Sequence, residues 1–461
     1  MYANIRSCVS VNGNKSGFFK TNCGVRQGEN LSPLLFSIFL NDIECYLKDL
    51  GNRGLDFSTL HEEMTTMLKI IVLLYADDTI LISDDPAKFQ KCLNDFANYC
   101  QMWKLNINTE KTKIVVFGSN SSCNYHFTLN KINIELVSTY KYLGTYFSKS
   151  GTFLAARKHF AQQARKALYL VYKRTFNLNL PLDLMFKLFD HTILPILTYS
   201  SEIWGYEDTQ ILERIHCEFI RKILKLKKST PLYMLYGETG RYPMSIMIKT
   251  RMIGFWNKLI TGNQNKLSYQ IYKFMLNVPN FKSKWVEFIK TILNQCGMGN
   301  VWIHQTSIQH NTIKLQVKQT LQDQYLQHWH ATLQESHKGR NYSIFKTTIS
   351  LEPYLINLNR ADYLNLIKFR TGNHRLPVET GRWNKVHYHD RKCPLCNSND
   401  VGDEMHYLLL CPFFESERKI LIKKYYYKRP NTLKYKEILT INTTSQLHKL
   451  AVFVRKILST W

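Results

Sequence analysis

The stretch that decides the fold spans residues 70–82 and reads IIVLLYADDTILI. An acidic pair, Asp77 and Asp78, stands between two short runs rich in Ile, Val and Leu. Each run predicts a buried strand, and Ala76, Asp77 and Asp78 predict the tight turn of a hairpin. Adjacent carboxylates repel each other and lose water when partly buried, so a bound divalent cation would stabilise them. An ordinary turn containing Asp is the alternative interpretation.

The charge of the chain is unevenly distributed. Its 461 residues carry a net charge of +26. Residues 1–140 contain 13 Lys and Arg against 14 Asp and Glu, residues 141–260 contain 19 against 8, and the remainder adds a further +16. This asymmetry predicts chemistry in the first part and contact with a polyanion in the second. A basic surface that serves only solubility is the alternative.

The number and spacing of the cysteines, together with the hydropathy of the chain, indicate the cellular compartment in which the protein is expected. The eleven cysteines are scattered and odd in number, which favours a reducing intracellular environment, nuclear or cytoplasmic. No run approaches the ~20 apolar residues that a membrane helix needs. The N-terminus lacks the basic head and apolar core of a secretion signal. We therefore expect a protein that is not secreted and has no membrane partner.

A glycine-bracketed loop precedes the first predicted helix. Ser32 suits the N-cap and Pro33 the first helical position, so a helix is expected from there to about Asp49. The loop before it places Arg26 and Gln27 near the positive end of that helix. Such a loop suits a phosphate group or the edge of a nucleotide.

Other elements follow from turn and cap signals. Asn12, Gly13 and Asn14 predict a hairpin between residues 5–11 and 17–21. Pro86 starts a helix that runs to about Trp103. Further strands are expected at residues 114–117 and 140–147.

Three ordered blocks together resemble the reverse transcriptases of non-LTR (LINE-type) retrotransposons. They are the loop Arg26-Gln27-Gly28 with Leu31-Ser32-Pro33, the hairpin Tyr75-Ala76-Asp77-Asp78, and the run Tyr142-Leu143-Gly144. A YxDD hairpin alone is a weak match, whereas all three blocks in this order and spacing are highly specific.

The resemblance implies roles for these residues. Asp77 and Asp78 would be catalytic palm carboxylates that bind Mg²⁺ in two-metal nucleotidyl transfer, with an RNA template and a DNA primer as partners. Template and nucleotide binding would fall to Arg26, Gln27, Gly28 and Tyr75. Lys111 or Lys113 would lie near the pyrophosphate. The primer grip would consist of Tyr142, Leu143 and Gly144.

One departure from the family pattern affects the expected activity. Family members carry the fingers, and a strand with the first catalytic Asp, upstream of the Gln-Gly loop, but residues 1–24 contain no Asp or Glu. Asp84 and Asp85 should lie roughly 20 Å along the outgoing strand, and Asp42 roughly 15 Å along its helix. Neither position replaces that Asp without rearrangement, so we expect a truncated palm with an incomplete Mg²⁺ site and no endonuclease domain.

Residues 151–235 predict three helices, at 153–176, 182–199 and 210–227. The last carries an apolar stripe surrounded by basic side chains, namely Arg214, Arg221, Lys222, Lys225 and Lys228. By resemblance this is the thumb, whose basic face follows the primer–template backbone, and a merely solvated face is the alternative. Three aromatic residues there are candidates either for base stacking or for the core: Tyr169, Tyr172 and Trp204.

A Cys-x2-Cys-x9-His-x4-Cys pattern lies near the C-terminus, at Cys393, Cys396, His406 and Cys411. This spacing fits a tetrahedral Zn²⁺ site whose four ligands all come from protein, so the site should be structural. His387 and His389 are competing ligands. The pattern resembles the C-terminal zinc-binding module of the same retrotransposon proteins, which implies nucleic-acid binding.

We therefore predict an α+β chain in four parts. Residues 1–150 form a partial reverse-transcriptase palm, an antiparallel sheet with helices, and residues 151–237 a helical thumb. Residues 238–340 form a helical connector, and residues 341–461 a C-terminal region with the zinc knuckle at 393–411. The predicted function is that of an RNA-directed DNA polymerase domain, and a catalytically inactive nucleic-acid-binding remnant is the alternative.

Overall fold

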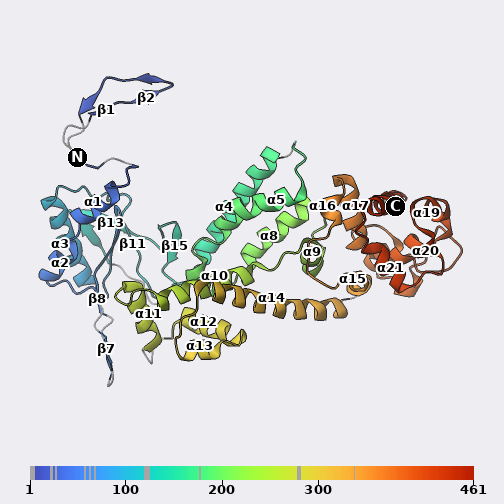
Figure 1. The fold of residues 1–461 in the computed structure, drawn as a ribbon. Coiled ribbons are helices and arrows are strands. Elements are labelled where there is room, and N and C mark those ends of the chain that lie inside the picture. The colour runs from blue at the N-terminus through green and yellow to red at the C-terminus, as the bar shows by residue number, and fades with distance from the viewer. Residues whose placement is uncertain are drawn as a thin grey trace. The chain divides into compact units, whose positions relative to one another are not determined.

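The computed structural model divides the chain into two compact units (Figure 1). The first comprises residues 1–152 with 270–281, and the second residues 153–269 with 282–461. The structure describes residues 6–20, 24–25, 28–56, 59–61, 64–66, 69–118, 125–175, 178–277, 282–336 and 338–461. In these residues no helix has both the length and the apolar character needed to cross a bilayer.

The acidic stretch of the first unit forms the predicted hairpin. Strands β9 (Val72–Tyr75) and β10 (Asp78–Leu81) pair antiparallel with Asp78 opposite Tyr75. The turn requires a left-handed backbone at Ala76, whose φ is 51°. The expectation of two buried strands is wrong in part, because Tyr75 is 62% exposed and burial is concentrated at Ile70 and Ile71.

The single helix expected from Ser32 to Asp49 is interrupted. Helix α1 (Ser32–Phe39) ends at Leu40, and α2 (Ile43–Asp49) starts after Asp42. Asn and Asp are poor residues for helix interiors because their side chains compete for backbone hydrogen bonds, which favours a break at Asn41 and Asp42. The predicted N-cap is also wrong, because Leu31 occupies that position without a side-chain cap and Ser32 lies inside the first turn.

Helix α3 (Pro86–Met102) begins where Pro86 predicts, with the Asp85 side chain accepting a hydrogen bond from the Lys88 amide at 2.8 Å. It contributes to two apolar clusters. Tyr99 and Cys100 pack with α2, and Leu93 packs with a three-stranded sheet. That sheet has the order β11 (Lys113–Ile114), β13 (Ile132–Leu136), β12 (Phe127–Leu129). Strand β11 runs parallel to β13, so the first unit is not purely antiparallel as predicted.

The remaining strands of this unit form small antiparallel pairs. The predicted N-terminal hairpin is confirmed, with Asn12 and Gly13 at positive φ. The single strand expected at 140–147 is wrong, since Leu143 and Gly144 turn the chain at positive φ between two strands. The pairs are β1 (Arg6–Ser7) with β4 (Phe19–Lys20), β2 (Ser10–Val11) with β3 (Asn14–Lys15), β5 (Leu55–Asp56) with β8 (Lys69–Ile70), β6 (Thr59–His61) with β7 (Met64–Thr66), and β14 (Thr139–Tyr142) with β15 (Thr145–Ser148).

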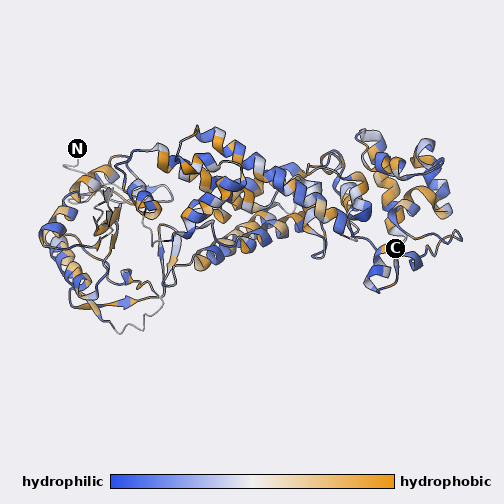
Figure 2. Cartoon of the chain, turned by 90° about the horizontal axis from the view of Figure 1, so that it is seen from below, coloured by the Kyte–Doolittle hydropathy of each residue, from blue (hydrophilic) through white to orange (hydrophobic). Residues whose placement is uncertain are grey.

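The second unit is helical, and its helices carry apolar and polar residues in alternation along their length (Figure 2). The helices expected at 153–176, 182–199 and 210–227 are present, although the middle one contains a π-helical turn and the last ends at Ile223. Their bounds are α4 (Leu154–Thr175), α5 (Leu182–Leu188), η1 (Phe189–Ile193), α6 (Leu194–Leu197), α7 (Ser201–Trp204), α8 (Gln210–Ile223) and α9 (Leu232–Thr239). The long helices α10 (Met244–Thr261) and α14 (His310–Glu335) lie side by side (Figure 1).

The other helices and helical turns after α10 are shorter, and the longest of them is the last, α22, which packs on α17. Their bounds are α11 (Leu267–Asn277), α12 (Lys284–Gln295), α13 (Gly299–Ile303), α15 (Gly339–Phe345), α16 (Tyr354–Asn357), α17 (Arg360–Arg370), α18 (Pro377–Trp383), η2 (Tyr388–Asp390), η3 (His406–Leu410), η4 (Pro412–Phe414), α19 (Glu415–Leu421), α20 (Lys424–Tyr427), α21 (Thr432–Leu439) and α22 (Thr444–Ser459).

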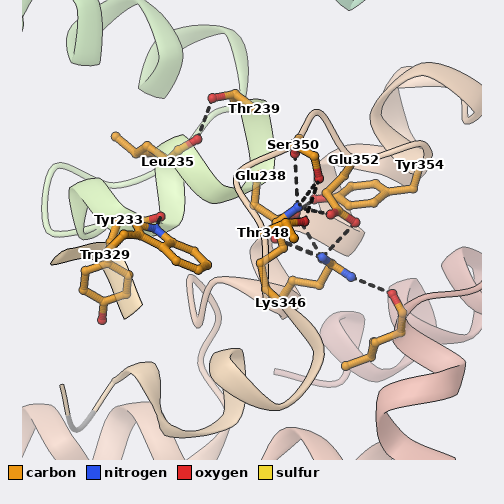
Figure 3. A network of polar contacts seen from close by, with 12 residues as sticks. Tyr233, Leu235, Glu238, Thr239, Trp329, Lys346, Thr348, Ser350, Glu352 and Tyr354 are labelled. Atoms are coloured by element: carbon orange, nitrogen blue, oxygen red, sulfur yellow. Dashed lines mark hydrogen bonds and ion pairs between the residues drawn. The ribbon is translucent and has the colours of Figure 1, made fainter. Parts of the chain in front are cut away.

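A buried polar network joins several of these helices (Figure 3). The Arg370 guanidinium donates to Glu238 at 3.0 Å, to Glu352 at 2.9 Å and to the Leu439 carbonyl at 2.6 Å. Lys346 pairs with Glu352, and the Tyr354 hydroxyl donates to Glu238. The network holds two cations and two carboxylates, so each buried charge has a partner.

Candidate functional sites

The two carboxylates of the hairpin are open to solvent. Asp77 lies in the turn and Asp78 is the first residue of β10, and both side chains are exposed. Adjacent carboxylates on a hairpin turn offer oxygen ligands of the type that Mg²⁺ takes, usually one or two from protein together with phosphate oxygens of a substrate. The residues therefore fit a magnesium site that is completed by a nucleotide.

A second hairpin approaches the acidic one within the first unit. Tyr142 is the last residue of β14, directly before the turn at Leu143 and Gly144. Burial raises the pKa of the Tyr142 phenol, and the nearby Asp78 and Tyr75 raise it further. Because charge effects of this kind require proximity, Asp78 and Tyr75 lie near the Tyr142 phenol.

The predicted nucleotide loop is described in part. Arg26 and Gln27 lie outside the described residues, whereas Gly28 has a φ of 85°, a backbone conformation suited to glycine. The two candidate lysines differ in their surroundings. The Lys113 ammonium pairs with Glu135 at 2.8 Å, while the Lys111 side chain is exposed.

Other acids of this unit are engaged elsewhere. Asp42 accepts a hydrogen bond from the Tyr99 hydroxyl at 2.5 Å, Asp84 pairs with Lys88 at 4.0 Å, and Asp85 caps α3. In the described part of the chain, only one group of three or more Cys, His, Asp or Glu side chains is positioned to hold a metal ion, and it does not include Asp77 or Asp78.

That group is the predicted set Cys393, Cys396, His406 and Cys411, whose ligand atoms all lie within 4.8 Å of one another. The Cys393 and Cys411 sulfurs are 3.9 Å apart, and the Cys396 sulfur lies 3.4 Å from His406 Nε2. Three sulfurs and one imidazole nitrogen at this spacing match the donors of a tetrahedral Zn²⁺ site. The competing histidines, His387 and His389, are exposed, and their ring centroids lie 5.6 Å apart with the planes tilted by 36°.

A π-helical turn brings the last two ligands together. Residues His406–Leu410 form η3, and the Cys411 amide donates to the His406 carbonyl at 2.7 Å, the five-residue hydrogen bond of a π turn. An α-helix would place a residue five positions later about 140° around the axis, away from His406. The π turn therefore places Cys411 on the same side of the helix as His406, which an α-helix would not do at this spacing.

The surroundings of the cluster suit a metal. Burial lowers the pKa of His406, which favours the neutral imidazole that metals bind. Burial alone would raise the pKa of Cys396, but hydrogen bonds from Ser398 outweigh it and hold that pKa below its usual value. Burial raises the pKa of Cys411 to about 12. A bound cation would lower that pKa, because it stabilises the thiolate.

Two acidic residues beside the cluster, Asp400 and Asp403, were not predicted from the sequence as part of the site. The Asp400 carboxylate lies 3.6 Å from His406 Nδ1, the nitrogen opposite the candidate ligand atom. This distance exceeds a hydrogen bond, so Asp400 acts on the ring only through its charge. The Asp403 side chain accepts from the His406 amide at 2.8 Å. An Asp three residues before the first ligand of a helical turn is an N-cap signal, and it was readable in the sequence.

The basic helix of the second unit has the predicted two faces. Ile215, Phe219 and Ile220 of α8 are buried, while Arg214, Lys222, Lys225 and Lys228 are exposed. Arg221 is an exception, because it donates to the Thr230 carbonyl at 3.0 Å. Among the aromatic candidates, Trp204 is fully buried and belongs to the core, whereas Tyr169 is 64% exposed. Tyr172 lies under the Lys222 ammonium, 4.0 Å from the ring centroid.

Comparisons with known proteins agree with the geometry of the first unit. Residues 2–147 match the family described as reverse transcriptase (RNA-dependent DNA polymerase). The chain is 25% identical over 236 residues to an RNA-directed DNA polymerase from the mobile element jockey of Drosophila melanogaster, covering 49% of this chain and 24% of that protein.

Two further relatives are shorter matches. A retrovirus-related Pol polyprotein from the type-1 retrotransposable element R2 of Popillia japonica is 29% identical over 136 residues, which are 28% of this chain and 18% of the relative. A transposon-derived protein of Caenorhabditis elegans is 30% identical over 165 residues, 33% of this chain and 56% of the relative. The chain spans about a quarter of the length of the jockey polymerases that it matches.

Proposed function

Because residues 2–147 carry a reverse transcriptase domain of the kind found in non-LTR retrotransposons, we propose that this chain takes part in DNA synthesis on an RNA template. The observation that carries the proposal is the exposed pair Asp77 and Asp78 on a hairpin turn, with Tyr142 close to Asp78. The partners would be an RNA template and a DNA primer.

The residues of this region take distinct roles in the proposal. Asp77 and Asp78 hold Mg²⁺, which when bound activates the primer hydroxyl and neutralises charge on the leaving pyrophosphate. Tyr142, Leu143 and Gly144 position the primer end beside Asp78. Lys111 contacts the pyrophosphate, because Lys113 is held by Glu135.

Primer extension on an RNA template with Mg²⁺ or Mn²⁺ tests the proposal. We expect incorporation by the protein and its loss, by a factor of about 100 or more, in Asp77→Asn and Asp78→Asn. Asp84→Asn is the matched control, since this exposed acid lies just beyond the hairpin and pairs only with Lys88 among the described contacts. Equal incorporation by Asp77→Asn and the unaltered protein would refute the assignment.

A second candidate function is nucleic-acid binding without polymerisation. It is favoured by one observation, namely that no third acidic, Cys or His side chain of the described residues joins Asp77 and Asp78. The same assay separates the two candidates. Binding of template–primer without incorporation in either metal supports the second and excludes the first for this chain.

We also propose that Cys393, Cys396, His406 and Cys411 bind one structural Zn²⁺, and that the surrounding module contacts nucleic acid. The support is the convergence of four suitable ligand atoms within 4.8 Å. Metal analysis of the purified chain should find about one zinc per molecule. Cys393→Ser should lose it and Cys45→Ser should retain it, because Cys45 is an exposed thiol outside the cluster. Full zinc content in Cys393→Ser would refute the site.

A further inference from the structure

An exposed tryptophan in the second unit is surrounded by basic side chains. Trp383, the last residue of α18, is 48% exposed, although large aromatic side chains are usually mostly buried. The Lys227 ammonium lies over its ring, 4.3 Å from the centroid. Lys227 belongs to the turn that follows α8, which also carries the exposed Lys225 and Lys228.

The two segments are fixed to each other by a buried amide. The Asn373 side chain accepts hydrogen bonds from the Thr230 hydroxyl at 2.9 Å and from the Lys227 amide at 3.3 Å. Asn373 and Thr230 are both buried, so water does not compete for these bonds. Asn373 thus holds the lysine turn, and Lys227 of that turn lies over Trp383. The lysine turn and the tryptophan therefore lie side by side although they are far apart in the sequence.

Further cations gather at this surface. Arg382 is anchored by an ion pair with the buried Glu379, and its side chain remains 34% exposed. Burial lowers the pKa of Lys338, and the positive charges of Arg382 and Lys227 lower it further against the opposing effect of Glu379 and Glu404. Arg382 neutralises the buried Glu379, whereas Lys225, Lys227 and Lys228 are all exposed. The exposed charge of this surface is therefore positive, which attracts phosphates.

An exposed indole ring surrounded by cations distinguishes single-stranded from double-stranded nucleic acid. Cations alone contact the phosphates of duplexes and single strands alike. An exposed aromatic ring adds stacking only where bases are unpaired, because the bases of a duplex already stack on each other. Arginine and lysine around the ring hold the backbone while the base lies on the indole.

We propose that Lys225, Lys227, Lys228, Arg382 and Trp383 form a binding surface for single-stranded nucleic acid, in which an unpaired base stacks on Trp383 and the cations contact the neighbouring phosphates. This inference deepens the nucleic-acid role proposed above and rests on it. It adds a defined surface and a preference for single strands. An acidic polypeptide is the competing partner.

Fluorescence anisotropy with the full chain tests the surface. The probes are labelled strands of about twenty nucleotides, as RNA and DNA, the abasic strand of equal charge, and the matching duplex. We expect Trp383→Leu to weaken single-strand binding about tenfold and to leave abasic and duplex binding within about twofold. Trp383→Phe should retain most of the affinity, which separates loss of stacking from loss of folding.

Tyr425→Leu is the matched control, because Tyr425 is 55% exposed and also lies under a lysine, with the Lys434 ammonium 4.9 Å from its ring centroid. It should bind every probe as the unaltered protein does. A strand with 5-iodouracil should crosslink to a peptide containing Trp383 on irradiation.

Three outcomes would overturn the inference. Unchanged single-strand affinity in Trp383→Leu would overturn the surface alone, while the wider nucleic-acid role would stand. Equal losses for abasic and base-containing strands would show that the ring does not stack. Failure of the unaltered chain to bind any strand, with binding to polyglutamate that Trp383→Leu abolishes, would overturn both the surface and the wider role and favour the acidic polypeptide.

Discussion

Arg370 illustrates how one residue organises the second unit. Its guanidinium is fully enclosed and contacts two carboxylates and a carbonyl from three different segments of the chain. An uncompensated charge at that depth costs several kcal/mol, so each partner depends on the others. The network (Figure 3) consequently links α9, α17 and α21.

Arg370→Met should destabilise the second unit by about 3–5 kcal/mol, because it leaves Glu238 buried without its main cation. Arg165→Met is the control, since the Arg165–Glu218 pair is 3.3 Å long with both side chains more than half exposed, and its loss should cost less than about 1 kcal/mol. Urea denaturation followed by helical circular dichroism measures both. Similar losses in the two variants would contradict the role assigned to burial.

Acid should weaken the same network. Burial alone would raise the pKa of Glu238, but the charges of Arg370 and Lys346 outweigh it and hold the pKa below the usual glutamate value. A carboxylate with a lowered folded pKa stabilises the protein above its unfolded pKa, and this stability is lost as the pH falls through the folded value.

Glu238→Gln should therefore be less stable near neutral pH and should lose less stability between about pH 5 and pH 3 than the unaltered protein. Glu218→Gln, which changes an exposed carboxylate, is the control. Urea midpoints across that range provide the measurement. A Glu238→Gln curve parallel to that of the unaltered protein would contradict the linkage.

At this scale the sequence was informative where the chemistry is local. The closely spaced Cys393 and Cys396 were predicted as one site without a structure and are brought together, and Asp77 and Asp78 are adjacent in the chain, so a common site for them stays a prediction. The pairing of Arg370 with Glu238 was not, because 132 positions separate them and many other Arg and Glu residues fit equally well.

Among the helices and strands, the π turn η3 is a feature that residue spacing alone does not reveal. The pattern His-x4-Cys identified the two candidate ligands but does not distinguish a π turn from an α-helical turn, which would separate them. The break between α1 and α2 was hidden for a related reason. The apolar residues Phe36, Leu40, Ile43 and Leu47 continue in helical register across it and contribute to one cluster, so periodicity gave no signal.

The geometry of η3 leads to a pair of insertion and deletion variants. Deletion of Leu410, which is 43% exposed, converts the π turn to an α turn in which residues four apart share a face, so about one zinc per chain should remain. Insertion of one Ala after Leu410 rotates Cys411 by about 100° and should abolish zinc binding.

Metal content of the purified variants measures the difference. Loss of zinc in both variants, with helical circular dichroism retained, would contradict the ligand geometry described for His406 and Cys411.

Over the whole chain, the change in charge along the sequence falls close to the boundary between the two compact units. The first 140 residues are nearly neutral, and the excess of basic residues lies downstream. The division after residue 152 separates most of the acidic-hairpin unit from the basic helical unit. The sequence predicted this contrast from composition. It did not predict that residues 270–281 return to the first unit, because no composition change marks them.

Binding of single-stranded nucleic acid should consequently depend strongly on salt. The four cations of the proposed surface neutralise about four phosphates, which gives a slope near −2.8 for the logarithm of affinity against the logarithm of salt concentration. Lys227→Ala should reduce the magnitude of that slope by about 0.7. Lys419→Ala should leave it unchanged, since this exposed lysine pairs with Glu415 at 2.7 Å away from the proposed surface.

Anisotropy titrations between about 50 and 200 mM salt give the slopes. A slope near zero for the unaltered chain would show that the contacts to nucleic acid are not mainly ionic.

The distance in sequence between Glu238 and Arg370 also affects how the chain is made. Ribosomes add about 5–20 residues per second, so the 132 positions between them correspond to roughly 7–26 seconds of synthesis. During that interval Glu238 lacks its main cationic partner, and α9 cannot be buried around it at low cost. The second unit therefore completes its fold only after translation has passed residue 370, and until then the nascent chain depends on solvent, or on a chaperone, to keep its apolar helices apart.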